Sequence, residues 1–338
     1  LLLSDQPNRD VSHDNDSKFW NWIDKVEVKE SRFPKKTPCQ SDTSHPSMAV
    51  NLDACIQCNL CVRACREVQV NDVIGMAYRG ENSKIVFDFD DPMGDSTCVA
   101  CGECVQACPT GALMPASVVD KDGVGHNHID KKVNSVCPYC GVGCQIEYNV
   151  KDNKIKYVNG IDGPANKNRL CVKGRFGFDY VNNPERLTKP LIRIKGKKKD
   201  LHPSINFSNI HEYFREASWE EAIDFAAEGF LDLKKKRNGK SNLAGFGSAK
   251  CSNEEAYLFQ KLIRTGFNTN NVDHCTRLCH ASSVAALLET IGSGAVTAPF
   301  YEVEHSDVII VIGANPTENH PVAATFFKNA AKKGSKLI

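Results

Sequence analysis

The clearest pattern of hydrophobic and polar positions is an alternation with a period of two in residues 145–150 and 154–158. Asp152 and Asn153 lie between the two segments, and this residue pair suits a tight turn. We therefore predict a β-hairpin in which one face of each strand packs against a core.

Hydrophobic positions recur at helical spacing after residue 218. Ser218 and Glu221 have the spacing of a capping box, in which each side chain binds the backbone N–H of the other residue. The periodic hydrophobic residues are Trp219, Ile223, Ala226, Phe230 and Leu233. The segment is predicted to be an amphipathic helix.

Strand-like and helix-like segments alternate from residue 243 to the end of the chain. Strands are predicted at 243–246 and 308–312, and helices at 253–266, from about 280 and at 318–333. This order is typical of a parallel, Rossmann-like α/β domain. Small residues follow both strands and could cradle an anion, but neither segment has a G-x-G-x-x-G or Walker sequence, so an ordinary turn explains them equally well.

Composition and charge exclude several classes of protein. A chain of 338 residues is long enough for two or three domains. The charge balance of 42 − 41 = +1 lacks the basic excess of a nucleic-acid-binding protein. No apolar run approaches the roughly 18–20 residues that a membrane-spanning helix needs. The first 47 residues are mostly polar, and residues 19–23 suggest one short helix in a connector.

The 16 cysteines change this ordinary picture. Two runs have the spacing C-x2-C-x2-C-x3-C, and Pro109 follows the second run. The first run contains Cys55, Cys58, Cys61 and Cys65, and the second contains Cys98, Cys101, Cys104 and Cys108. This spacing is typical of ferredoxins with two 4Fe-4S clusters, in which the fourth cysteine of each run binds the other cluster. A disulfide framework or zinc fits two such quartets poorly.

The exchanged fourth ligands define two predicted quartets. One cluster is assigned to Cys55, Cys58, Cys61 and Cys108, and the other to Cys98, Cys101, Cys104 and Cys65. A third set consists of Cys137, Cys140, Cys144 and Cys171. Its spacing alone also permits zinc, but its place after two clusters and the small Gly141 and Gly143 favour a third 4Fe-4S cluster.

Four cysteines stay outside these sets. An isolated cysteine is more often a small buried hydrophobic residue than a ligand, and we interpret Cys39 in this way. Cys275 and Cys279 flank one helical turn beside His274 and His280. Their spacing is compatible either with a small zinc site or with one face of a helix.

The predicted fold class is therefore α+β and α/β with several domains. We expect a connector at 1–47, a two-cluster ferredoxin-like module at 48–114, a linker at 115–135, a small β-rich 4Fe-4S domain at 136–190 and the start of the α/β domain at 191–338. The linker prediction depends on polar residues and turn chemistry.

Five segments together resemble the catalytic subunit of molybdenum or tungsten formate dehydrogenases, of the type with extra clusters that works with NAD-reducing subunits. They are residues 42–76, CPYCGVGC with RLCVKGR, GSAKCSNEEAYLFQKLIR, NNVDHCTRLCHASSVAALLETIGSGA and GANPTENHP. The resemblance covers most of residues 43–338. It implies three 4Fe-4S clusters and a metal held by two molybdopterin guanine dinucleotides.

The resemblance also implies roles for individual residues. Cys279 corresponds to the protein ligand of the metal, His280 to the active-site histidine and Lys173 to the link between the third cluster and a pterin. Contacts to the pterin dinucleotides are expected at Ser248, Asn253, Glu254, Gly313, Asn315 and Glu318. Lys250 stands where relatives often have arginine, so a bidentate anion contact would become a point-charge contact.

The implied reaction is the reversible oxidation of formate to carbon dioxide. Electrons would pass through the third cluster and then the two ferredoxin-like clusters to a flavin-containing, iron-sulfur partner that reduces NAD. Cluster thiolates suit the reducing cytoplasm. The choice between molybdenum and tungsten does not follow from one thiolate.

Two other classes of protein share parts of this pattern. One is another molybdopterin oxidoreductase such as a nitrate reductase, which usually lacks the adjacent histidine and the two-cluster front. The other is a non-catalytic electron-transfer subunit resembling the large iron-sulfur subunit of respiratory complex I, which needs no thiolate such as Cys279. The chain begins with Leu1 and ends soon after Gly334, so we expect an internal fragment that by itself is inactive.

Overall fold

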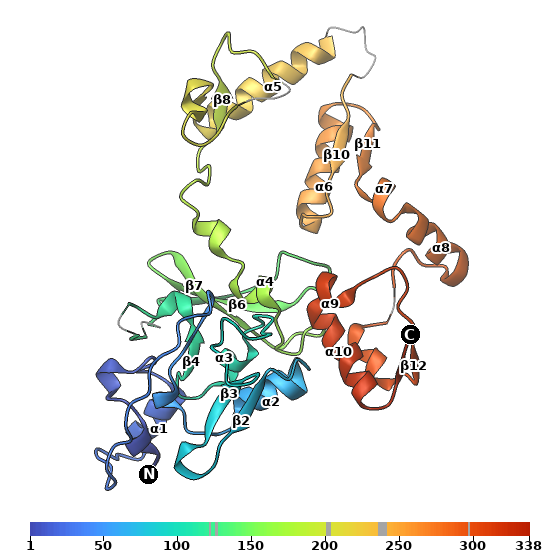
Figure 1. The fold of residues 1–338 in the computed structure, drawn as a ribbon. Helices are drawn as coiled ribbons and strands as arrows, with labels where there is room; N and C mark the ends of the chain where they lie inside the picture. Colours follow the sequence, from blue (N-terminus) through green and yellow to red (C-terminus); the bar gives the residue numbers. More distant parts are fainter. Residues whose placement is uncertain (122, 126–127, 201–203, 236–241, 297) are drawn as a thin grey trace. The chain divides into compact units, whose positions relative to one another are not determined.

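The computed structural model describes residues 1–121, 123–125, 128–200, 204–235, 242–296 and 298–338. The chain forms two compact units (Figure 1). Unit 1 contains Leu1–Asn182 and Ala298–Ile338, and unit 2 contains Asn183–Thr297. No helix within the described ranges is long and apolar enough to cross a membrane.

Unit 1 includes the ferredoxin-like module, in which two short antiparallel strand pairs hold the cysteine loops. Its elements are β1 (Met48–Val50), α2 (Leu60–Arg63), β2 (Ile74–Ala77), β3 (Lys84–Phe87), α3 (Glu103–Ala107) and β4 (Leu113–Pro115). Strand β1 pairs with β4, and β2 pairs with β3. A π-helical turn, Ala64–Val68, continues α2. Buried Met48, Ile74, Phe87 and Met93 pack with cysteines of both runs in one core.

Residues 1–47, which the sequence suggests as a connector, pack against the loops of the cysteine runs. Helix α1 (Lys18–Lys25) begins after Ser17, whose hydroxyl accepts the Trp20 N–H. The Phe19 N–H donates to Pro109 O at 3.0 Å, and Gln6 Nε2 donates to Ala54 O at 2.8 Å. This segment therefore holds the backbone beside Cys55 and Cys108, which spacing alone does not reveal.

The hairpin predicted over 145–158 is present and has a third strand. Its strands are β5 (Lys131–Val136), β6 (Gln145–Lys151) and β7 (Lys154–Gly160), and all pairs are antiparallel. Asp152 and Asn153 have φ of 50° and 57°, as a tight hairpin turn requires. Most of β5 lies in the predicted linker at 115–135. Its residues are all exposed, so no alternation indicated a strand.

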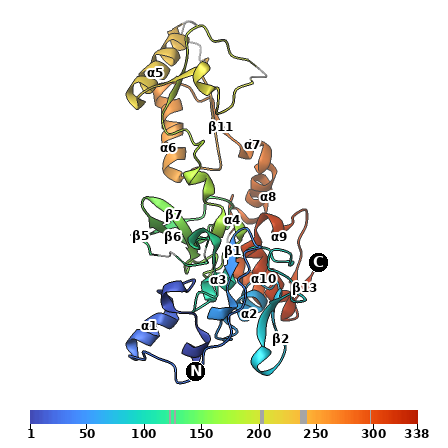
Figure 2. The same cartoon turned by 60° about the vertical axis from the view of Figure 1, so that its left-hand side comes forward.

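The last segment of unit 1 packs on the third cysteine set. It contains β12 (Val308–Ile309), α9 (Pro316–Asn319), α10 (Pro321–Lys332) and β13 (Lys336–Leu337). Strands β12 and β13 are parallel. Val322 and Ala323 of α10 join the core that contains Cys137, Cys144 and Leu170. Figure 2 shows α9 and α10 beside the helix that follows Cys171, α4 (Val172–Phe176).

Unit 2 contains most of the predicted helices. Its elements are β8 (Leu191–Arg193), β9 (Phe214–Glu216), α5 (Trp219–Lys235), β10 (Gly245–Gly247), α6 (Asn253–Lys261), β11 (Val272–His274), α7 (Thr276–Cys279) and α8 (Ala281–Ile291). Strands β8 and β9 are antiparallel, and β10 and β11 are parallel. The two predicted strands, observed as β10 and β12, thus belong to separate two-stranded parallel sheets.

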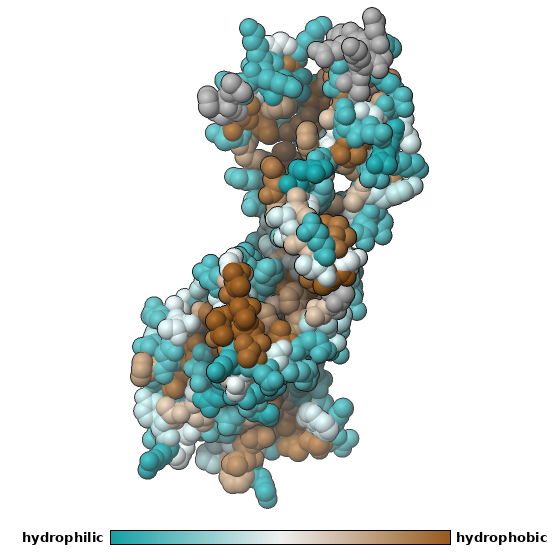
Figure 3. All heavy atoms as spheres, turned by 90° about the vertical axis from the view of Figure 1, so that its right-hand side faces the viewer, coloured by the Kyte–Doolittle hydropathy of each residue, from teal (hydrophilic) through white to brown (hydrophobic). Residues whose placement is uncertain are grey.

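The capping box predicted at the start of α5 is only half formed. The Glu221 N–H donates to Ser218 Oγ at 3.1 Å, but the Glu221 carboxylate binds the Arg215 guanidinium. A complete capping box occurs instead at α6, between Ser252 and Glu255. The apolar side chains of α5 that define its helical period are exposed within unit 2, and hydrophobic groups are visible at the surface of this unit (Figure 3).

Candidate functional site

The two cysteine runs have the same local backbone geometry. The Gln57 N–H points to Cys55 Sγ at 3.4 Å, and the Ala100 N–H points to Cys98 Sγ at 3.3 Å. Both donor residues have a φ of 54°. Backbone N–H groups directed at sulfur stabilise the negative charge of cluster thiolates. The sequence repeat is therefore also a repeat in structure.

Each run contributes its fourth cysteine to the cavity of the other run. One cavity is bordered by the four cysteines Cys55, Cys58, Cys61 and Cys108. A second cavity is bordered by Cys65, Cys98, Cys101 and Cys104. The structure thus brings together the same two quartets that the exchanged pattern predicts.

The chemistry of these positions fits a metal cluster. Burial, followed by the nearby Cys108, Cys55 and Cys58, raises the pKa of Cys61 to about 12. Such a thiol stays protonated at neutral pH unless a metal ion replaces the proton. Cys104 is buried, and burial raises its pKa well above the ordinary value. Iron would supply the positive charge that these buried thiolates need.

A four-iron cluster suits the two quartets better than a single zinc ion does. A tetrahedral zinc ion needs four ligands at only about 2.0–2.3 Å. A four-iron cubane is larger, so cavities bordered by four separate cysteines suit it better.

The third cysteine set lies at a larger cavity within unit 1. Cys137, Cys140, Cys144 and Cys171 all border this cavity. The Cys137 N–H donates to Cys144 O at 2.8 Å, which closes the first loop. Burial, followed by the other three cysteines of the set, raises the pKa of Cys144 to about 12. We name this space the third-cluster cavity.

Glycines shape the wall of the third-cluster cavity. Gly143 has a φ of +71°, which favours glycine at this position. A Cβ at Gly174 would lie 3.4 Å from Cys137 Sγ. A Cβ at Gly141 or at Gly143 would meet open space, so the expected need for backbone room gains no support at either position, and only the positive φ explains Gly143.

The third-cluster cavity adjoins the cavity of the second quartet. Cys101, Val99 and Asn71 border both spaces. None of these residues borders the cavity of the first quartet. The second quartet is therefore the immediate neighbour of the third cysteine set.

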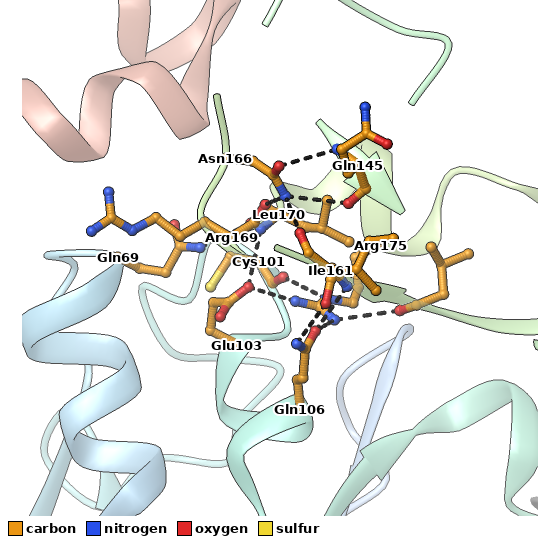
Figure 4. A network of polar contacts seen from close by, with 12 residues as sticks. Gln69, Cys101, Glu103, Gln106, Gln145, Ile161, Asn166, Arg169, Leu170 and Arg175 are labelled. Atoms are coloured by element: carbon orange, nitrogen blue, oxygen red, sulfur yellow. Dashed lines mark hydrogen bonds and ion pairs between the residues drawn. The ribbon is translucent and has the colours of Figure 1, made fainter. Parts of the chain in front are cut away.

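A buried polar network joins the ferredoxin-like module to the third cysteine set (Figure 4). Arg175 of α4 is 2% exposed, and its Nε donates to Cys101 O at 3.1 Å. Its Nη2 donates to Glu103 Oε1 at 2.5 Å, and Nη1 donates to Gln106 Oε1. A Cβ at Gly102, where φ is +71°, would lie 2.9 Å from the Arg175 side chain.

The same network holds the residue that precedes Cys171. Leu170 N–H donates to Glu103 Oε1 at 3.0 Å, and Leu170 O accepts from Gln69 Nε2 at 2.9 Å. Side chains of the ferredoxin-like module thus fix the backbone of the third set from both sides. Arg175 and Glu103 were not predicted as functional residues from the sequence. The only hint of this network in the sequence is the position of Arg175 in RLCVKGR, two residues after Lys173.

Two other predicted site residues lie on the third-cluster cavity. Lys173 and Glu318 both border it. Gly313 and Asn315 precede α9 in unit 1, where Gly313 has a φ of 65°. Neither residue is among those that border the cavity.

The predicted metal ligand and the other pterin contacts lie in unit 2. Cys279 ends α7 and is exposed, and His280 follows it. Ser248 follows β10, while Asn253 and Glu254 begin α6. The Cys279 N–H donates to Cys275 O at 3.2 Å, so this pair lies one helical turn apart, as one of the two sequence interpretations expects.

Three successive parts of the chain match known protein families. Residues 54–112 match the 4Fe-4S dicluster domain, residues 130–183 the molybdopterin oxidoreductase Fe4S4 domain, and residues 186–338 the molybdopterin oxidoreductase domain. The chain has the domains of a molybdopterin oxidoreductase. Iron-sulfur clusters and molybdopterin are the cofactors for which these domains are named.

Curated relatives carry more specific names. "Probable oxidoreductase YjgC" of Bacillus subtilis is 34% identical over 94% of this chain. "Putative formate dehydrogenase SH0748" of Staphylococcus haemolyticus is 32% identical over 95% of this chain. In both cases the chain spans 34% of the length of the relative.

One solved structure is also similar to part of this chain. An NAD+-reducing NiFe-hydrogenase in the H2-reduced state shares 25% sequence identity, with a TM-score of 0.30. The match covers 34% of this chain and 50% of the hydrogenase chain.

Two substitutions test whether Cys65 and Cys108 each bind the cluster of the other cysteine run. The EPR spectrum of the reduced Cys65→Ser protein is expected to match that of Cys101→Ser, because both residues border the second cavity. The spectrum of Cys108→Ser should instead match that of Cys58→Ser. Cys39→Ser is the control, because Cys39 lies outside both quartets and is exposed, not buried as its sequence context suggested. A Cys65→Ser spectrum that matched Cys58→Ser would contradict the exchange.

Proposed function

We propose that this chain belongs to the catalytic subunit of a formate dehydrogenase that converts formate to carbon dioxide, a proton and two electrons, reversibly. The observation that carries the proposal is the adjacency of the third-cluster cavity and the second quartet through Cys101. This adjacency supports a route for single electrons away from a molybdopterin site. The names of the curated relatives favour formate as the substrate.

The residues have defined tasks in this proposal. A molybdenum or tungsten ion with two molybdopterin guanine dinucleotides supplies, when bound, the two-electron chemistry. Cys279 would hold the metal through its thiolate, and His280 would accept the proton released from formate. Pterin contacts are assigned to Ser248, Asn253, Glu254, Gly313, Asn315 and Glu318. Lys173 borders the third-cluster cavity, and its charge would link the third cluster and a pterin by stabilising negative charge there.

The cysteine sets carry the electrons onward. Clusters held by the third set, by Cys65, Cys98, Cys101 and Cys104, and by the first quartet would supply one-electron transfer in this order. A partner with flavin and iron-sulfur clusters then reduces NAD, and the reducing cytoplasm is the proposed compartment. The ferredoxin-like module supports this assignment, because an electron that stays in the catalytic domain would not need two further clusters.

The proposal is tested on the protein expressed anaerobically at its full natural length. We expect molybdenum or tungsten, pterin, about 12 iron ions in the clusters of this segment, and dye reduction that depends on formate. Nitrate is offered to the dye-reduced protein as the competing substrate. Nitrate turnover without formate turnover would replace the proposal with a nitrate reductase. Iron without pterin would favour an electron-transfer subunit.

A further inference from the structure

A lysine of α10 reaches into the boundary between the second and third cysteine sets. Lys328 Nζ donates to Val70 O at 3.1 Å and to Asn71 Oδ1 at 2.9 Å. Its side chain is half-buried and borders the third-cluster cavity. Lys328 belongs to none of the motifs that the sequence analysis singles out.

The two hydrogen-bond acceptors of Lys328 belong to the loop that holds the second quartet. Asn71 borders the second cavity as well as the third. The Asn71 N–H donates to Cys65 O at 3.0 Å, and the Val73 N–H points to Cys65 Sγ at 3.3 Å. Asn71 therefore connects the Lys328 ammonium group to Cys65, a proposed cluster ligand.

Lys328 differs from Lys332, the other lysine of α10, because it contacts a residue that borders the second cavity. The pKa of Lys328 is lowered, chiefly by burial, although Cys101 and Cys65 act in the opposite direction. Both cysteines belong to the second quartet. Lys332 lies one turn later, is exposed, and donates to Arg66 O at 3.2 Å. A half-buried cation is screened by water less than an exposed one.

We propose that Lys328 raises the reduction potential of the second-quartet cluster, so that this cluster accepts electrons from the third cluster. This inference rests on the proposed function. Each electron adds one negative charge to the cluster, and a nearby fixed cation stabilises the reduced form more than the oxidised form. Lys328 acts on the cluster through space and is not a catalytic residue.

A purely structural role for Lys328 makes a different prediction. Its two hydrogen bonds also fasten α10 to the loop at 70–71, so their loss could simply loosen the fold. A loosened fold would lower cluster content or thermal stability without a specific change in one potential. The reduction potential of the second-quartet cluster separates the two roles.

The test is a redox titration followed by EPR on the complete holoenzyme. Lys328→Gln is expected to shift the midpoint potential of the second-quartet cluster to more negative values and to slow its reduction by formate. Lys328→Arg, which keeps the charge, is expected to retain the wild-type potential. Lys332→Gln is the matched control and should shift the potential less. Lys328→Met serves as a second neutral variant if Lys328→Gln loses iron.

Each outcome decides a separate point. An unchanged potential in a neutral variant with full iron content overturns the role of Lys328. An equal shift in Lys328→Arg and Lys328→Gln also overturns it, because charge would then not be the cause. Absence of the second-quartet signal from the wild-type holoenzyme overturns the proposed electron path itself, and that result is visible before any variant is made.

Discussion

Replacing Cys279 with alanine is expected to abolish formate-dependent dye reduction while the cluster content stays unchanged. Cys279 ends α7 in unit 2, and none of the three cysteine sets includes it. Loss of a partner that only supports a metal ligand already costs about 10–100-fold in activity or affinity. Loss of the proposed ligand itself should cost at least about 100-fold.

Cys275 provides the matched control for this prediction. It lies one helical turn before Cys279, is also exposed, and is the same residue type. Cys275→Ala is expected to keep formate turnover near the wild-type value. Molybdenum or tungsten, pterin and iron are measured in both variants. Wild-type turnover in Cys279→Ala with bound pterin would remove Cys279 from the site, and loss of turnover in both variants would point to a structural role of α7.

Replacing Arg175 with methionine is expected to destabilise unit 1 by about 3–5 kcal/mol, because a buried charge loses its partner. The Arg175 and Glu103 side chains are 2% and 9% exposed, and their contact distance is 2.5 Å. The substitution also removes the donor to Cys101 O. Thermal unfolding is monitored under anaerobic conditions through the loss of cluster absorbance. The variant should unfold at a clearly lower temperature than the wild-type protein.

A surface ion pair and a double variant give this prediction its controls. Arg63 and Glu67 form an exposed pair at 3.0 Å, with side chains 65% and 54% exposed. Arg63→Met should therefore cost less than about 1 kcal/mol. Arg175→Met combined with Glu103→Gln should recover part of the loss, since no unpaired charge then stays buried. Equal effects of Arg63→Met and Arg175→Met would refute the argument from burial.

Local patterns predicted much of the architecture. The hairpin at 145–158 follows from alternation and from a turn pair that tolerates positive φ. Helices α5 and α6 lie where apolar spacing indicates them. Strand β5 escaped prediction because all its residues are exposed and its stability comes from pairing with β6. Edge strands of this kind carry little hydrophobic signal.

The sequence by itself determined the three cysteine sets and the families to which the chain is similar, because ligand spacing is a local property. Only the tertiary structure decided which set adjoins which, since Cys101 borders two cavities that no spacing connects. It also brought Arg175 to Glu103 across 72 residues, and Lys328 to Asn71 across 257 residues. Contacts at such separation depend on how whole elements pack, and a single arginine or lysine in a helix carries no local sign of its buried partner.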